Sequence, residues 1–238
     1  MEITRLTNPA MELGELPPID LVVLSHSHAD HFDRVAQKDL DKSLPIVTTP
    51  EAVEELKERG FTNAHALNTW SSLLVRKGDV SLRITSTPGR HGPLLSDLVL
   101  PEVMGSMLEF QSPMKKTLYR MYVSGDTLVM DDMKEIARRY PNIDLALLDL
   151  GGARVLGVMV TMDAKQGVQM MQTVNSKRVI PLAYNDYNIT EPPLLDFKQA
   201  VNVAGLQDRV RYLNYGGTYI FKSLPEHANS RDSASNVH

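Results

Sequence analysis

The sequence contains no cysteine, so disulfide bonds and thiolate metal sites are excluded. Any metal would have to be held by nitrogen and oxygen ligands. Long apolar segments are also missing, because no run approaches the ~20 residues that cross a bilayer as a helix. The N-terminal stretch MEITRLTNPA lacks the apolar core of a signal peptide. We therefore expect no transmembrane segment and a cytoplasmic location.

The sequence also lacks an excess of positive charge. The formal net charge is −4, which argues against a surface for nucleic acid or anionic lipid and favours a small-molecule substrate. With 42% hydrophobic and 23% charged residues, the composition is that of a globular protein. We expect one domain over residues 1–222, followed by a polar tail over residues 223–238.

Apolar runs and amphipathic stretches alternate along the chain, which predicts alternating strands and helices. The continuous apolar run at 20–26 is typical of a strand buried on both faces. The loop at 92–107 has the length of a lid or binding edge, and a disordered connection is the alternative. Further strands are expected at 44–50, 144–150, 178–184, RVRYLN (209–214) and TYIFK (218–222), hairpins at 72–89 and 107–126, and helices at 31–40, 50–60, 130–140, 164–175 and 193–205. This order predicts an α/β sandwich of two mixed sheets covered by helices.

The stretch VVLSHSHADHFD (22–33) carries His26, His28, Asp30 and His31, three of the seven histidines of the chain. Side chains alternate along a strand, so the first two histidines should point the same way. Asp30 and His31 fall where the next helix is expected, and its dipole should favour a neutral, metal-binding imidazole at His31. Chance gives H-x-H-x-D-H in about 1 of 2,000 shuffled sequences. Helix capping is an alternative role for Asp30 alone, and it explains none of the histidines.

The stretch SHSHADHFD resembles the signature of the metallo-β-lactamase fold hydrolases, and further matches follow in order. TSTPGRHGP resembles the segment that carries the next ligand, His91, and MYVSGDT the strand end that carries a bridging carboxylate, Asp126. The resemblance runs from about residue 5 to residue 222 and implies an αββα sandwich. LDLGG, VTMDAKQG and IPLAYNDY are most similar to the branch with the L-ascorbate-6-phosphate lactonase and the N-acyl-phosphatidylethanolamine phospholipase D.

His91 and Asp126 also have plainer interpretations. A lone loop histidine is more often a surface residue, and an aspartate in a Gly-Asp-Thr turn often caps that turn. Both nevertheless follow predicted strands, where proteins with helical crossovers bind ligands. His65 matches no motif and is expected at or near the surface.

The resemblance sorts the ligands into two sets. His26, His28, His91 and Asp126 would complete one metal site, for which Zn²⁺ is expected and Mn²⁺ or Fe²⁺ are alternatives. Asp30, His31 and Asp126 would form a second site, but Ala183 stands where the family has its last histidine. Asp149 or Asp186 could supply an oxygen instead, although turn and cap roles are favoured for both.

The chain begins close to the segment RLTNPAMEL, so we expect the family's N-terminal β-hairpin to be missing. An uncovered sheet edge invites pairing with another chain. A homodimer through such an edge and a chain truncated relative to its gene are therefore the two options.

Three functions fit these patterns. The first is a metal-dependent hydrolase in which a metal-bound hydroxide attacks an ester, lactone or phosphodiester-type bond, with Asp126 orienting and Asp30 accepting a proton. The second is a mononuclear-iron oxygenase on the same fold. The third is a non-catalytic member with an incomplete second metal site. We favour the hydrolase because the first ligand set is complete, and the substrate is not readable from the sequence.

Overall fold

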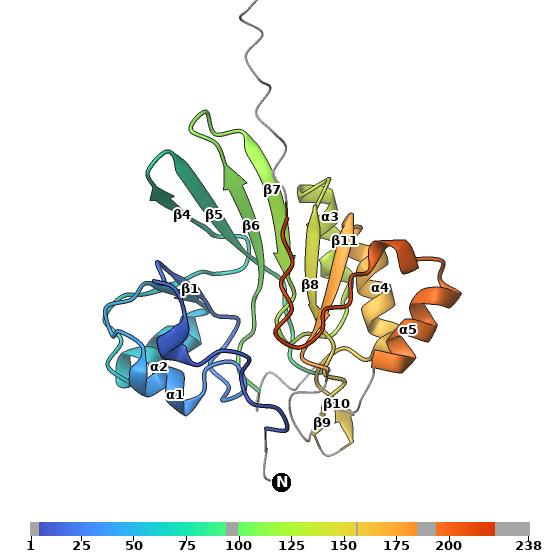
Figure 1. Cartoon of the computed structure of the whole chain (residues 1–238), viewed down its shortest axis with the longest axis horizontal. Helices are drawn as coiled ribbons and strands as arrows, with labels where there is room; N and C mark the ends of the chain where they lie inside the picture. The colour runs from blue at the N-terminus through green and yellow to red at the C-terminus, as the bar shows by residue number, and fades with distance from the viewer. Residues whose placement is uncertain (1–4, 94–99, 156, 185–193, 222–238) are drawn as a thin grey trace, which may run out of the picture.

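Two sheets lie face to face between two layers of helices (Figure 1). The computed structural model describes residues 5–93, 100–155, 157–184 and 194–221. The small sheet is parallel, with the strand order β1-β2-β3, and the large mixed sheet has the order β11-β8-β7-β6-β5-β4. The strands are β1 (Val22–Val23), β2 (Ile46–Thr48), β3 (Ala64–Ala66), β4 (Ser72–Lys77), β5 (Val80–Thr87), β6 (Gly105–Gln111), β7 (Thr117–Val123), β8 (Leu145–Asp149) and β11 (Arg178–Leu182), with a separate hairpin of β9 (Arg154–Val155) and β10 (Val158–Met159).

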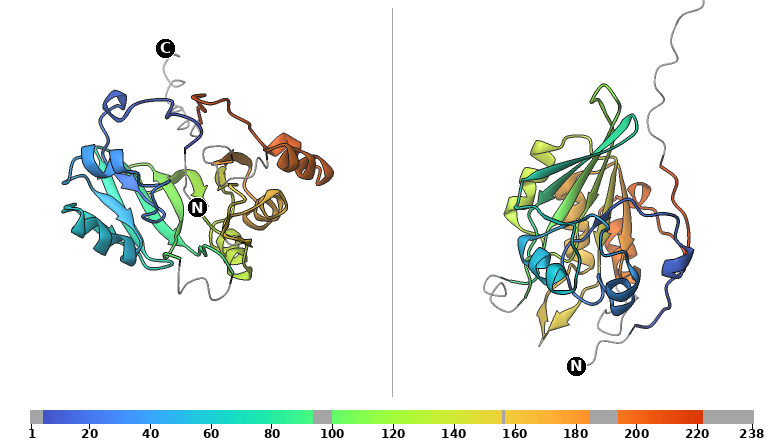
Figure 2. Two further views of the ribbon diagram at one scale, coloured as in Figure 1. Left: turned by 90° about the horizontal axis from the view of Figure 1, so that it is seen from below. Right: turned by 90° about the vertical axis from the view of Figure 1, so that its left-hand side faces the viewer.

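Helices cover the outer face of each sheet (Figures 1 and 2). The helices of the small-sheet side are η1 (Leu13–Glu15), α1 (Arg34–Asp39) and α2 (Pro50–Glu58), and those of the large-sheet side are η3 (Asp131–Met133), α3 (Lys134–Arg139), α4 (Ala164–Val174), α5 (Leu194–Val203) and η4 (Gln207–Arg209). No helix in the described part of the chain is long and apolar enough to cross a membrane.

Three buried clusters correspond to the three interfaces between these layers. Phe32, Ile46 and Leu56 fill the space between the small sheet and its helices. Val47 and Ile84 belong to the cluster between the two sheets. The largest cluster joins the large sheet to α3, α4 and α5 and includes Tyr122, Met133, Leu148, Met170 and Phe197. The αββα sandwich is thereby confirmed.

Local sequence signals explain where α2 and α4 begin. Thr49 accepts a hydrogen bond from Ala52 N–H at 3.2 Å, and Pro50 follows at a position where no amide hydrogen is needed. Asp163 caps α4 by accepting from Gln166 N–H at 2.9 Å. The buried residues Gly167, Met170, Met171 and Val174 recur at helical spacing, so α4 presents one apolar face to the sheet.

Several sequence predictions need correction. The strand expected over 20–26 is reduced to Val22–Val23, although Leu24 N–H still donates to Val47 O at 2.9 Å. The small sheet is wholly parallel rather than mixed. The short strands β3, β9 and β10 were not predicted, because runs of two or three residues carry no readable periodicity.

The two closing strands expected at 209–214 and 218–222 are also wrong. Only an isolated bridge between Val210 and Val179 forms in this part of the described chain. Leu213 and Tyr219 instead pack, partly buried, against Tyr119, Leu145 and Ile180 without forming strands.

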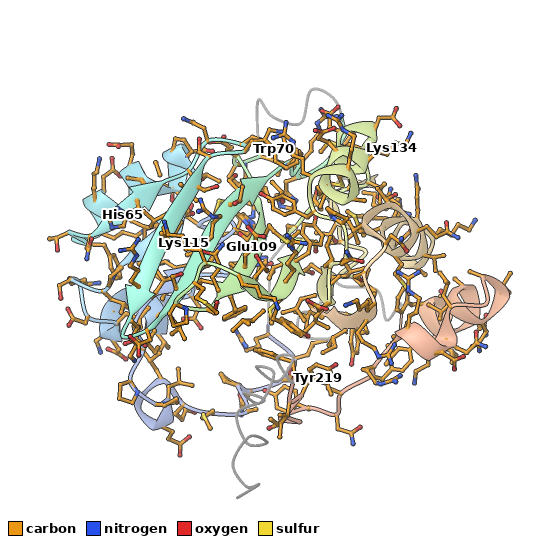
Figure 3. The ribbon with its side chains drawn as sticks, turned by 90° about the horizontal axis from the view of Figure 1, so that it is seen from above. His65, Trp70, Glu109, Lys115, Lys134 and Tyr219 are labelled. Carbon is orange, nitrogen blue, oxygen red and sulfur yellow. The ribbon has the colours of Figure 1, made fainter. Side chains whose placement is uncertain are left out.

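Surface features outside the site agree with their plainer interpretations. His65 is exposed on β3, where its Nε2 lies 2.9 Å from Asn63 Oδ1 (Figure 3). Residues 94–99 of the long loop expected at 92–107, and the tail at 223–238, lie outside the described residues. Between residues 5 and 21 the structure describes η1 and no strand. The outer strands are β1 and β3 in the small sheet and β11 and β4 in the large sheet. A homodimer through such an edge stays a prediction.

Candidate metal centre

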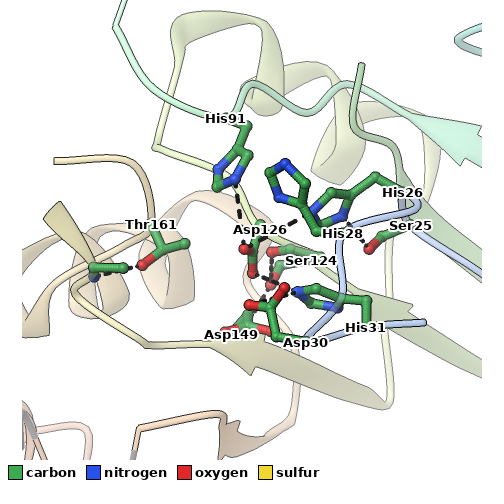
Figure 4. Close-up of polar contacts among 12 residues, drawn as sticks. Ser25, His26, His28, Asp30, His31, His91, Ser124, Asp126, Asp149 and Thr161 are labelled. Carbon is green, nitrogen blue, oxygen red and sulfur yellow. Dashed lines mark hydrogen bonds and ion pairs between the residues drawn. The ribbon is translucent and has the colours of Figure 1, made fainter. Parts of the chain in front are cut away.

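Polar side chains from both sheets converge at the carboxyl ends of their strands (Figure 4). His26 and His28 follow β1, His91 follows β5, and Asp126 follows β7. This is the end of an open sheet where ligands bind in α/β proteins. The structure brings together all six residues selected from the sequence, and we describe them as two halves that share Asp126.

The histidine half consists of His26, His28 and His91, whose candidate ligand atoms all lie within 4.8 Å of one another. His26 Nε2 is 3.0 Å from His28 Nδ1. The Nε2 atoms of His26 and His91 lie 4.0 and 3.8 Å from Asp126 Oδ2. Three imidazoles and one carboxylate oxygen therefore face a common centre.

Two contacts outside the predicted set hold these rings. Ser25 Oγ lies 2.9 Å from His26 Nδ1, and His91 Nδ1–H donates to the backbone oxygen of Val160 at 2.9 Å. Such contacts at the second ring nitrogen fix the orientation of a metal-binding imidazole. Val160 directly follows the β9–β10 hairpin, so this unpredicted hairpin positions His91.

The carboxylate half consists of Asp30, His31 and Asp149. His31 Nε2 lies 3.2 Å from Asp126 Oδ1 and 3.9 Å from Asp30 Oδ2. The ligand atoms of His26, His31 and Asp126 form a second group within 4.8 Å. Asp149, the last residue of β8, hydrogen-bonds Asp126 through its carboxyl group and lies close to Asp30 (Figure 4).

The turn and cap roles favoured for Asp149 are therefore not what the structure shows. Its carboxyl group is part of the site, while its own N–H donates to Ser124 Oγ at 2.9 Å. Asp30 does not cap the helix either, because Asp33 accepts the hydrogen bond from Ala36 N–H at 2.8 Å. His91 is buried rather than a surface residue. Asp186 lies outside the described residues.

The two halves differ in electrostatics when no metal is bound. Burial lowers the pKa of His26 to about 2, with a further contribution from His31, and burial also lowers the pKa of His28. Burial would lower the pKa of His31 as well, but the hydrogen bond and charge of Asp126 outweigh it and raise the pKa to about 9. The expectation that a helix dipole keeps His31 neutral is therefore wrong, because α1 begins only at Arg34 and the nearby carboxylate dominates.

The two coupled carboxyl groups shift in opposite directions. Burial opposes ionisation of Asp126, but the hydrogen bond and charge of His31 hold its pKa well below the usual range. Burial and the charge of Asp126 raise the pKa of Asp149 well above its usual range. Asp126 is thus the carboxyl group that ionises more readily, and Asp149 the one whose neutral form is favoured.

These residues fit a metal ion. Two imidazole nitrogens only 3.0 Å apart and a buried carboxyl pair both need a proton or a cation between them. The ligand atoms are nitrogen and oxygen only, and the histidine half has the His₃ composition that zinc accepts with a position left for water.

Gly125 allows the two sheets to approach at the site. Its φ is +61°, and an added Cβ would lie 2.7 Å from Ser25 Cβ and 3.0 Å from Met104 O. The residue before Asp126 must therefore be glycine for both conformational and steric reasons.

Ala183 occupies the position after β11 where the resembled family has a histidine. It has a φ of +54° and is half-buried. Leu182, its predecessor, is paired with Asp149 in the parallel β8–β11 ladder, and Leu150 N–H donates to Leu182 O at 3.0 Å. Asp149 and Ala183 thus end neighbouring strands.

Residues 2–184 match the model of the Beta-lactamase superfamily domain. The chain belongs to this superfamily. A metal-dependent hydrolase from Nanoarchaeum equitans is 26% identical over 192 residues, which cover 81% of this chain and 82% of that protein. Igni18, a metallo hydrolase from Ignicoccus hospitalis, superposes with a TM-score of 0.67 at 25% identity over 89% of this chain and 85% of that one.

A more distant neighbour has a different chemistry. CmlA, a diiron β-hydroxylase from Streptomyces venezuelae, superposes with a TM-score of 0.63 at 15% identity, over 85% of this chain and 45% of that one. At this identity the similarity shows the fold alone.

Proposed function

We propose that this enzyme, a metal-dependent hydrolase like its superfamily relatives, uses a metal-activated water to cleave an ester, lactone or phosphodiester-type bond. The convergence of three imidazoles on Asp126 at the strand ends, with His28 beside them, is the observation that carries the proposal. A small molecule is the proposed substrate. The net negative charge argues against nucleic acid as a substrate, and a cytoplasmic location is proposed.

Two metal positions are proposed. His26, His28, His91 and Asp126 would hold the first, for which Zn²⁺ is the favoured ion because imidazoles predominate. Asp30 and His31 with the shared Asp126 would hold the second. Mn²⁺ or Fe²⁺ are the alternatives where oxygen ligands predominate.

The chain's own groups then have separate tasks. When bound, the metal would supply a water of lowered pKa and polarise the oxygen that gains charge. Asp126 faces both halves and would fix their relative position. Asp30, half-buried at the edge of the cluster, would accept the proton released by the attacking water.

The finer family assignment is also a proposal. LDLGG, VTMDAKQG and IPLAYNDY support the branch with the L-ascorbate-6-phosphate lactonase and the N-acyl-phosphatidylethanolamine phospholipase D. Within that branch, Ala183 would mark the loss of the last histidine ligand.

Metal removal and one ligand variant test the hydrolase. Protein stripped with a chelator should lose hydrolysis of a panel containing a p-nitrophenyl ester, a lactone and bis(p-nitrophenyl) phosphate, and regain it with Zn²⁺ or Mn²⁺. His28→Ala should lower that activity by more than ~100-fold, because removing a ligand costs at least as much as removing its outer partner. The control His65→Ala changes an exposed histidine and should be fully active. Full activity in the stripped protein would overturn the proposal.

Two other functions have specific support. A histidine-plus-carboxylate set also suits iron, so His26, His28 and His91 with Asp126 support a mononuclear-iron oxygenase as the second candidate. Iron as the bound metal together with oxygen uptake would identify it. Ala183 supports a non-catalytic member, for which new activity in Ala183→His would be the evidence.

A further inference from the structure

We propose that Asp149 replaces the missing histidine as a ligand of the second metal, which makes that position rich in oxygen and suited to Mn²⁺. This inference rests on the proposed function, because it assigns a ligand to the second metal position of the same site. The resulting donor set would be Asp30, His31, Asp126 and Asp149. In the resembled pattern the last ligand is a histidine after the strand that corresponds to β11, at the position of Ala183. In this donor set the ligand is Asp149, at the end of the neighbouring strand β8.

The register of the large sheet supports the exchange. Leu182 is the partner of Asp149 in the parallel β8–β11 ladder, so Ala183 and Asp149 leave neighbouring strands at the same edge. A histidine at Ala183 and an aspartate at Asp149 would therefore reach the site from adjacent places. The methyl group of Ala183 offers no ligand atom.

The position of Asp149 is fixed by backbone contacts. Its N–H donates to Ser124 Oγ at 2.9 Å, and Ser124 N–H donates to Leu147 O at 3.0 Å. These contacts tie the ends of β7 and β8 together, two residues before Asp126. A carboxylate held in this way can serve as a ligand with little loss of conformational freedom.

The charges around Asp149 also indicate a cation. Its carboxyl group interacts with Asp126, His31 and Asp30, and the ion pairs described for Asp126 and Asp30 are all with histidines. Asp126 pairs with His26, His31 and His91, and Asp30 pairs with His31, whereas no ion pair is described for Asp149. A divalent metal would balance this charge, and carboxylate oxygens are the ligands that suit Mn²⁺.

Metal binding by the whole chain tests the assignment directly. Metal-free protein is loaded with one equivalent of Zn²⁺ and titrated with Mn²⁺, with free Mn²⁺ measured by electron paramagnetic resonance and bound metals by mass spectrometry. The wild type should bind one further Mn²⁺. Asp149→Asn should weaken this Mn²⁺ binding at least ~10-fold while keeping its one Zn²⁺. The matched control Asp132→Asn, at an exposed position of η3, should bind as the wild type does.

A rescue variant keeps the result independent of folding. The double variant Asp149→Asn/Ala183→His should bind a second metal again. Its second position should prefer Zn²⁺ over Mn²⁺ more strongly than the second position of the wild type does. Unchanged Mn²⁺ affinity in Asp149→Asn, or no second metal in the wild type, would overturn the inference. Failure of the proposed function would look different: the titrations would give the expected metals, but no substrate of the panel would be hydrolysed.

Discussion

The two halves of the site offer different ligand atoms to a metal: mainly imidazole nitrogens in one and mainly carboxylate oxygens in the other. In the histidine half, burial lowers the pKa of His26 and His28. The outer ring nitrogens of His26 and His91 are held by Ser25 Oγ and Val160 O. The carboxylate half gathers oxygen atoms around His31, whose pKa is raised. Neutral nitrogen ligands favour zinc, whereas anionic oxygen ligands favour harder ions. The difference implies that the two positions have different metal preferences and can be disrupted separately, except at the shared Asp126.

The largest effect is expected from Asp126→Asn, because this carboxylate faces the histidines of both halves. The variant should lose both metals and lower hydrolysis by more than ~100-fold. Mass spectrometry of the purified variant gives the metal content. One metal retained at wild-type affinity would show that the halves do not depend on a shared carboxylate.

Gly125→Ala should disrupt both halves through the fold rather than through a ligand. The new methyl group would clash with Ser25 and Met104 at a φ of +61°, at a cost of about 1–3 kcal/mol for the overpacking alone. Gly60→Ala is the matched control, since Gly60 also has a positive φ but no atom within 4 Å of the added carbon. Urea unfolding of both variants measures the difference, and equal losses of stability would contradict the close approach of the two sheets.

A pair of serine variants should separate the halves. Ser25→Ala removes the contact with His26 Nδ1 and should weaken Zn²⁺ binding about 10–100-fold. Ser124→Ala removes the acceptor of Asp149 N–H and should weaken the second metal alone. Zn²⁺ and Mn²⁺ titrations of each variant provide the measurement. If Ser25→Ala and Ser124→Ala both weakened binding of the same metal, the result would argue against two distinct metal positions.

The smallest effect concerns the pH dependence of the metal-free protein. The pKa of His31 is raised from 6.5 to about 9, so the folded state keeps a proton that the unfolded state releases. Its contribution to stability is therefore complete below pH 6.5 and is lost as the pH rises through about 9. Urea midpoints between pH 6.5 and 9 in the presence of a chelator should fall less steeply in His31→Gln than in the control His65→Gln. Equal slopes would contradict the pairing of His31 with Asp126.

Much of this arrangement could be predicted from the sequence. The spacing in SHSHADHFD and the positions of His91 and Asp126 after predicted strands were enough to select six residues that the structure brings together. The apolar runs also predicted both hairpins of the large sheet, β4–β5 and β6–β7. Local signals of this kind act within a few residues of the chain, so they can be read without knowing the fold.

The supporting contacts could not be predicted in the same way. Val160 reaches His91 through a hairpin with two-residue strands, and Asp149 reaches Asp126 through the order and register of β7, β8 and β11. Neither depends on a motif. Asp149 therefore looked like a turn residue until the neighbouring strand ends were known.

Metal content under competition tests the difference between the halves most directly. Metal-free wild-type protein is dialysed against one equivalent of Zn²⁺ with a tenfold excess of Mn²⁺, and the bound metals are then counted by mass spectrometry. We expect one Zn²⁺ and one Mn²⁺ per chain, because the imidazoles take the zinc and the carboxylates take the manganese. One Zn²⁺ with no Mn²⁺, or no bound metal at all, would contradict the account of two unlike metal positions around Asp126.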